Sequence, residues 1–92
     1  MSPIETKVFD VIASVAQAPA VQIDASTRLI GEARLFDSMK LVELCLLLED
    51  LAAELGFEFD WTSDAAMSRS ASMFRTAGSL ATEFTRQMNA RP

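Results

Sequence analysis

The chain contains no histidine, no tyrosine and a single cysteine, Cys45, among its 92 residues. Without histidine, no Ser-His or Cys-His pair can activate a nucleophile. A single cysteine excludes an internal disulfide, and the lack of further cysteine or histidine ligands argues against zinc, so no metal site is expected. The three glycines do not form a phosphate-binding loop. Together these absences argue against an autonomous enzyme.

Basic residues are also few, since 8 Lys and Arg stand against 13 Asp and Glu, which gives a net charge of −5. Nucleic acid and anionic lipid both require a cationic face, so neither is an expected partner, whereas proteins with basic surfaces are favoured. The longest apolar run, 44–48, is far too short to span a membrane. The N-terminus lacks the pattern of a signal peptide, and with one unpaired cysteine we expect a cytoplasmic, monomeric, single-domain protein over 1–92.

Apolar periodicity predicts helices and little strand. The first helix is expected over 3–16, with Ser2 as its cap and Pro3 at its first position. Its apolar stripe consists of Ile4, Val8, Val11, Ile12 and Val15. Residues 17–37 then form a long connection, and such long connections are usually functional. Its scattered apolar residues, which are Val21, Ile23, Leu29 and Ile30, predict that it folds back over the core.

The second helix is expected over 38–55, with Asp37 as its N-cap, and spans roughly 27 Å. Side chains were placed at intervals of 100° around its axis. One broad face is apolar and must be core; it consists of Leu41, Leu44, Cys45, Leu48, Leu51, Ala52 and Leu55. The opposite side presents an acidic strip of Glu43, Asp50 and Glu54 beside the apolar Met39, Val42 and Leu46. Such a surface suits docking of a basic, partly apolar partner.

The C-terminal half is expected to contain two further helices. Residues 57–61 read as an extended crossing segment with its aromatic side chains directed inward. A short helix follows from 63–64 through Met67, and the small, polar residues 68–72 predict a break. The last helix is expected from Thr76, with an apolar repeat at Leu80, Phe84 and Met88, and residues 89–92 are expected to fray. The predicted fold is an all-α four-helix bundle with a long first loop and a short third helix.

The start of the second helix resembles the modification site of acyl carrier proteins. Residues 35–44 read Leu-Phe-Asp-Ser-Met-Lys-Leu-Val-Glu-Leu, and Leu-Glu-Asp follows at 48–50. The family has Asp-Ser-Leu, then Val-Glu-Leu, then an acidic pair. Residues 76–84, from Thr-Ala-Gly-Ser-Leu to Phe84, resemble the start of the family's last helix. The resemblance extends over about residues 3–88 and agrees with the predicted four-helix order.

The resemblance implies a non-catalytic acyl carrier. A separate phosphopantetheinyl transferase would move 4′-phosphopantetheine from coenzyme A to Ser38, which follows Asp37, and the terminal thiol would hold acyl groups as thioesters. A helix N-terminus suits an anionic phosphodiester, because its backbone N–H groups are unpaired. Acyl-loading and acyl-transfer enzymes with basic patches would be the other partners. The expected docking residues are Met39, Val42, Glu43, Leu46, Glu49, Asp50 and Glu54.

The same residues allow plainer interpretations. Ser38 is also an ordinary helix N-terminal serine, the acidic residues are also a solubilising face, and Cys45 is expected to be a core thiol. The apolar interior could shelter an acyl chain, but ordinary core is the favoured interpretation for its candidate lining residues. These residues are Leu44, Cys45, Leu48, Phe57, Phe59, Trp61 and Leu80.

The chain also departs from the family pattern. Met39 replaces the usual leucine, Lys40 stands where many members carry an acid, the second helix is longer, and 59–76 is extended. These departures suggest a carrier dedicated to one lipid or secondary-metabolite pathway. Two alternatives stay open: an aminoacyl or peptidyl carrier, and an unmodified helical interaction module. The change Ser38→Ala should abolish carrier function and leave such a module nearly intact.

Overall fold

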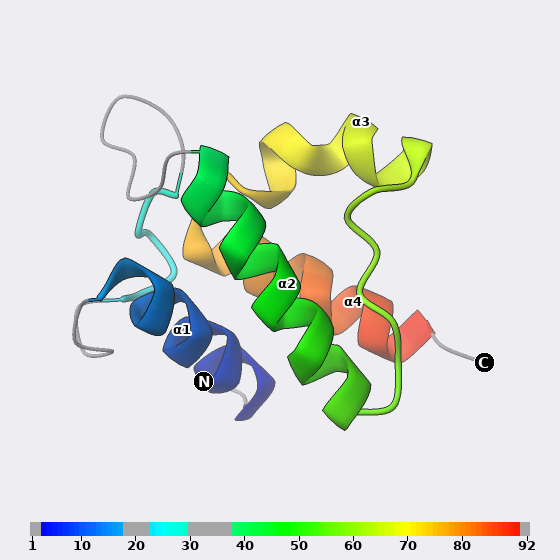
Figure 1. Ribbon diagram of the computed structural model, residues 1–92, viewed down its shortest axis with the longest axis horizontal. Helices are drawn as coiled ribbons and strands as arrows, with labels where there is room; N and C mark the ends of the chain where they lie inside the picture. The colour runs from blue at the N-terminus through cyan, green and yellow to red at the C-terminus, as the bar shows by residue number, and fades with distance from the viewer. Residues whose placement is uncertain (1–2, 18–22, 30–37, 91–92) are drawn as a thin grey trace.

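The computed structural model describes residues 3–17, 23–29 and 38–90, and this part of the chain is helical with no strand. Its helices, drawn in Figure 1, are α1 (Pro3–Ala16), α2 (Ser38–Glu54), α3 (Asp64–Met73) and α4 (Ala77–Ala90). Helix α1 packs against both α2 and α4, and α3 packs against α4. The expectation of an all-helical fold is confirmed.

One apolar core joins residues of all four helices with described residues of the segments between them. From α1 it takes the predicted stripe, together with Phe9 and Ala13, which the periodicity did not single out. The aromatic centre of the core is Phe84 on α4, which meets Phe57 edge-on at a centroid distance of 5.0 Å and Phe59 at 5.3 Å. Each fully buried side chain of this size contributes about 1.5–3 kcal/mol relative to exposure.

Helix α2 buries the face that its sequence predicts. Leu44, Leu48 and Ala52 are fully buried, and Leu41 is half-buried at the edge of the core. The helix ends one residue earlier than expected, because the backbone turns away at Gly56, whose φ is 87°. A residue without Cβ adopts this left-handed conformation without strain.

Two backbone hydrogen bonds cap the C-terminus of α2. The Gly56 N–H donates to the Ala53 carbonyl at 3.2 Å, and the Phe57 N–H donates to the Ala52 carbonyl at 3.0 Å. This arrangement satisfies helical carbonyls that would otherwise lack partners. It also directs the chain back along α2, so that the predicted crossing segment begins with Phe57 already buried.

Residues 23–29 pack over the core and dock on the first turn of α4. Ile23 and Leu29 are buried, which confirms that part of the connection folds back; Val21 and Ile30 lie outside the described residues. Backbone bonds attach this loop to α4. The Ala77 N–H donates to the Thr27 carbonyl at 2.8 Å, and the Gly78 N–H donates to the Ala25 carbonyl at 3.0 Å.

The start of α4 is further capped by its own side chains. The Ser79 N–H donates to Thr76 Oγ1 at 3.1 Å, and the Thr76 N–H donates to Ser79 Oγ at 3.0 Å. This reciprocal pair gives hydrogen-bond partners to two backbone N–H groups that would otherwise lack them at the helix start. Thr76 is therefore the cap and Ala77 the first helical residue, one position after the predicted start.

Two predictions in the C-terminal half are wrong. Helix α3 continues through the expected break at 68–72 and ends at Met73. Ala66 and Met73, two turns apart on one face, are both buried, and this anchoring outweighs the weak helix preference of the serines between them. Helix α4 continues to Ala90, so residues 89 and 90 are helical rather than frayed. The proposed caps Ser2 and Asp37 lie outside the described residues.

Candidate functional site

Ser38 is the first residue of α2, as the motif requires of the candidate attachment residue. Its side chain and the whole of Asp37 lie outside what the structure describes. The first turn of α2 contains no acidic residue. Lys40 is the charged residue of this turn, and its Nζ lies 4.0 Å from Glu43 Oε2. The electrostatics of this turn therefore favour an anion over a cation.

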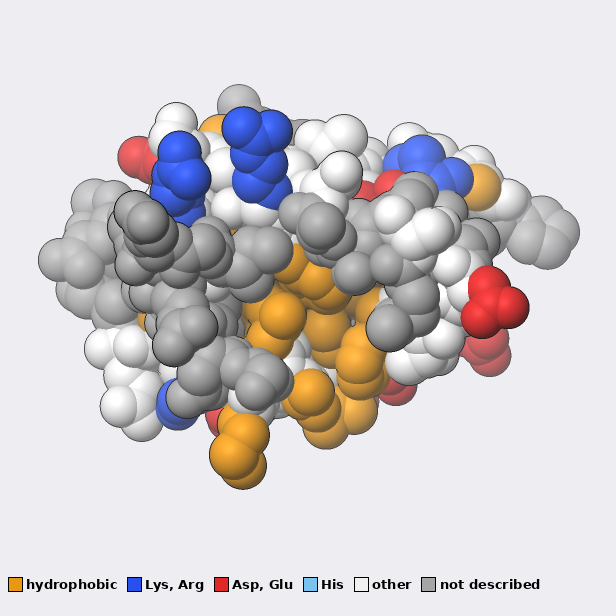
Figure 2. Space-filling model, turned by 90° about the horizontal axis from the view of Figure 1, so that it is seen from above, with side chains coloured by type: hydrophobic (Ala, Val, Ile, Leu, Met, Phe, Trp, Pro, Cys, Tyr) orange, Lys and Arg blue, Asp and Glu red, His pale blue; other side chains and the backbone are white. Residues whose placement is uncertain are grey.

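Three apolar side chains of α2 face solvent and define what we call the α2 strip. Met39 is 82% exposed, Val42 is 46% exposed and Leu46 is 51% exposed. Figure 2, which looks down on the end of the molecule where α2 begins, shows hydrophobic side chains gathered in a central hollow of that face. Three exposed apolar side chains on one helix are typical of an interaction surface.

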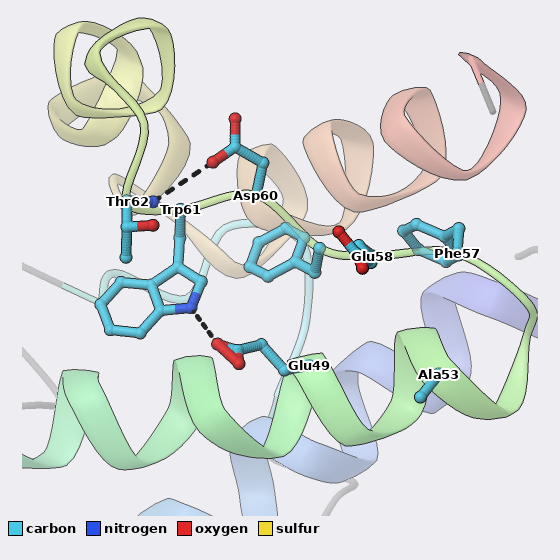
Figure 3. Close-up of a pocket in the computed structure, with 8 residues that line it drawn as sticks. Glu49, Ala53, Phe57, Glu58, Asp60, Trp61 and Thr62 are labelled. Atoms are coloured by element: carbon cyan, nitrogen blue, oxygen red, sulfur yellow. Dashed lines mark hydrogen bonds between the residues drawn. The ribbon is translucent and has the colours of Figure 1, made fainter.

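The acidic residues predicted for docking lie on two sides of α2. Glu43, Asp50 and Glu54 are exposed, as their helical positions predict. Glu49 is exposed as well, but it points toward the crossing segment, where its Oε2 accepts a hydrogen bond of 2.7 Å from Trp61 Nε1 (Figure 3). Glu49 therefore has a structural role that the sequence pattern did not reveal.

A cavity of about 470 Å³ lies between α2 and residues 57–62. Figure 3 shows Trp61 reaching from this segment to Glu49, with Ala53 farther along the helix. The lining residues are Glu49, Ala53, Phe57, Glu58, Phe59, Asp60, Trp61 and Thr62. Aromatic rings and carboxylates contribute about equally, so this cavity is not a purely apolar tunnel.

The crossing segment is fixed from both sides. On the α4 side, the Asp60 N–H donates to Gln87 Oε1 at 2.7 Å, and Gln87 Nε2 donates to the Asp60 carbonyl at 2.9 Å. On the α2 side, the Trp61 indole donates to Glu49. Asp60 Oδ1 also accepts the Ser63 N–H, and Ser63 Oγ caps α3 by accepting the Ala66 N–H. The segment thus links α2, α3 and α4.

Cys45 is a core thiol, as expected. It is 1% exposed, and burial, helped by the nearby Glu49 carboxylate, raises the pKa of the Cys45 thiol to about 12. A nucleophilic cysteine needs a lowered pKa and access to solvent. Cys45 has neither, so its thiol is not a nucleophile in the folded protein.

Most of the candidate lining residues for an acyl chain are ordinary core. Leu44, Cys45, Leu48 and Leu80 are at most 1% exposed, and all belong to the single apolar cluster. Phe57 and Phe59 are also buried, which confirms that the aromatic side chains point inward, whereas Trp61 is half-buried against the cluster.

Within the described ranges, no helix is long and apolar enough to cross a membrane. Among the same residues, no group of three or more cysteine and carboxylate side chains could hold a metal ion. Comparison of the chain with protein-family models, with curated proteins and with solved structures gives no match. The resemblance to acyl carriers therefore depends on the motif residues and the helix order.

Sequence reasoning missed several residues that shape these surfaces. Leu47, which is 37% exposed, was not assigned to either face of α2. Gln87 gave no apolar signal, although its amide fixes the crossing segment. Asp10 lies on the polar side of α1, and only the packing of α1 against α2 brings it to a groove with α2 residues.

Proposed function

We propose that this protein is an acyl carrier of the four-helix acyl-carrier type, with 4′-phosphopantetheine attached to Ser38. The observation that carries the proposal is the coincidence of Asp-Ser-Met with the beginning of a 17-residue helix, where Ser38 is the first residue. The helix order and the downstream Val-Glu-Leu add support. The thiol of Cys45 adds no support, but it is buried and is therefore not exposed to compete with Ser38.

The attachment is a group transfer performed by a separate transferase. The Ser38 oxygen forms a bond to the phosphorus that carries the pantetheine arm. The pyrophosphate P–O bond of coenzyme A breaks, adenosine 3′,5′-bisphosphate leaves, and the hydroxyl proton passes to a base of the transferase. When attached, the cofactor supplies a thiol that holds acyl groups as thioesters.

The first turn of α2 fits such a group. Its N–H groups carry partial positive charge, and the turn has Lys40 and no acid, so a phosphodiester on Ser38 meets favourable electrostatics. Met39, next in the chain, is 82% exposed, so the turn lies at the surface. A transferase can approach this end of α2 without opening the core.

Partner enzymes are proposed to dock on the α2 strip and the carboxylates that flank it. Apolar contacts with Met39 and Leu46 would supply affinity, and acidic side chains would steer basic partners to the carrier. Glu49 can contribute with Oε1, since only its Oε2 accepts the Trp61 hydrogen bond. Lys40 places a positive charge beside these acids, and we propose that it narrows the set of partners to one pathway.

The decisive experiment is modification of the purified chain with coenzyme A and a broad-specificity phosphopantetheinyl transferase, followed by intact mass measurement. The wild type is expected to gain one phosphopantetheinyl group, and Ser38→Ala is expected to gain none. Ser72→Ala, which removes another exposed serine of a helix, is the matched control and should be modified like the wild type. No mass gain by folded wild-type protein would overturn the proposal.

A second candidate function is an unmodified interaction module. The observation that favours it is that the large exposed hydrophobic side chains of the described residues, Met39, Val42, Leu46 and Leu47, all lie on α2. A module would bind its partner equally well with Ser38→Ala, whereas a carrier would lose function. The mass measurement and this variant therefore separate the two candidates.

A further inference from the structure

A groove of about 310 Å³ lies between α1 and α2, beside the α2 strip, and shares with the flank of that strip the carboxylates Asp50 and Glu54. We call it the α1–α2 groove. Its floor is apolar and comes from Val11, Leu47 and Leu51, of which Leu47 is 37% exposed. The remaining lining residues are Asp10, Ser14, Asp50 and Glu54. Three carboxylates therefore surround an aliphatic floor at the junction of two helices.

These three carboxylates have no partner within the described part of the chain. Asp10, Asp50 and Glu54 are all exposed, and none of them takes part in an ion pair or side-chain hydrogen bond there. By contrast, Glu43 and Glu83 both have a cationic neighbour. Like charges gathered around one groove repel each other, and this repulsion is relieved when a cationic group enters.

We propose that the α1–α2 groove is a docking site for a basic amphipathic helix of a partner protein. A branched aliphatic side chain of that helix occupies the floor over Leu47, and flanking Lys or Arg side chains pair with Asp10, Asp50 and Glu54. This mode uses apolar anchors for affinity and charge for orientation. The inference does not depend on the modification of Ser38, because no residue of the groove belongs to the first turn of α2.

Charge complementarity selects this occupant over a second copy of the chain. A second copy carries a net charge of −5 and adds repulsion at an acidic groove. A purely apolar segment would cover the floor but leave the three carboxylates unneutralised. A helix with lysines on both sides of a leucine stripe satisfies both requirements.

The test uses unmodified, isotope-labelled protein and a synthetic helical peptide of leucine and lysine, about 18 residues long so that it can be helical. Backbone amide shifts of the protein are followed during titration. The largest shifts are expected at Asp10, Val11, Leu47 and Glu54, and the affinity should fall with added salt. A matched peptide with glutamate in place of lysine should not bind.

Variants then separate the groove from net charge. Asp10→Asn should weaken binding about two- to fivefold, the range for one exposed ion pair. Leu47→Ala should weaken it about five- to tenfold through lost apolar contact. The control Glu58→Gln removes the same charge from an exposed carboxylate outside the groove and should leave the affinity unchanged.

Three outcomes would overturn the inference. The first is that the shifts centre on the α2 strip rather than the groove. The second is that Glu58→Gln weakens binding as much as Asp10→Asn, which would mean that net charge alone attracts the peptide. The third is that groove signals change with protein concentration before any peptide is added, which would mean that a second copy occupies the groove. Modification of Ser38 is measured separately, so each proposal can fail alone.

Discussion

The substitution Gly78→Ala should destabilise this protein, although glycine-to-alanine changes in helices usually do the opposite. Gly78 lies in the first turn of α4, where the loop at Ala25 crosses it. A Cβ at position 78 would stand 2.8 Å from the Ala25 carbonyl oxygen, 2.9 Å from the Ala25 Cβ and 3.1 Å from its Cα. Two of these three atoms are backbone, so the loop itself must move.

The opposing energies can be compared directly. Helix propensity favours alanine by at most about 1 kcal/mol. Overpacking against a backbone costs about 1–3 kcal/mol, and losing the bond from the Gly78 N–H to Ala25 costs about 0.5–1.5 kcal/mol more. We therefore expect a net loss of about 1–3 kcal/mol, which lowers the Tm by about 4 °C or more for a chain of this size.

Thermal unfolding followed by far-ultraviolet circular dichroism measures this change. The double variant Ala25→Gly with Gly78→Ala should recover part of the loss, because it removes the Cβ–Cβ contact but leaves the carbonyl contact. The control Ala53→Gly, on the exposed side of α2, should cost about 1 kcal/mol through propensity alone. A rise in Tm for Gly78→Ala would refute the close approach of the loop to α4.

Three further predictions concern the crossing segment and the buried thiol. Trp61→Phe removes the indole donor to Glu49 and should lower the free energy of unfolding by about 1 kcal/mol in denaturant titration; an unchanged midpoint would contradict the bond. Gln87→Ala leaves the part-buried N–H and carbonyl of Asp60 without this partner and should cost about 1–3 kcal/mol in the same assay, a larger loss than Trp61→Phe. Because the pKa of Cys45 is raised to about 12, its protonated form is favoured by folding, so stability should fall as pH rises above about 9, where the unfolded thiol ionises. Alkylation of native protein should accordingly stay slow through pH 9 and become fast in denaturant, and fast labelling of folded protein would show that the thiol is accessible.

The buried faces were predictable because they follow from periodicity alone. Leu44, Leu48 and Ala52 repeat at helical spacing, and the structure buries all three. The exposure of Met39 and Leu46 was predicted from the same helical spacing of 100° per residue. The buried face of a helix can therefore be predicted without knowing which other helices it contacts.

What the sequence did not reveal depends on contacts between distant segments. The continuity of α3 comes from burial of Ala66 and Met73, and propensity alone favoured a break. The structural role of Glu49 depends on Trp61, twelve residues later in the chain, whose indole N–H donates a hydrogen bond to the Glu49 carboxylate on α2. The α1–α2 groove needs the packing of two helices before Asp10 and Glu54 become neighbours of one cavity.

The docking of residues 23–29 on α4 has a consequence for the order of events during synthesis. The acceptor at Ala25 and the donor at Gly78 are 53 positions apart, so the backbone bonds between this loop and α4 cannot form until residues 77 and 78 have left the ribosome. Contacts of such long sequence separation form late and slow folding. Residues 23–29 are thus attached only after α4 has been made, and a nascent chain that ends before α4 would lack the backbone bonds that hold this loop in place.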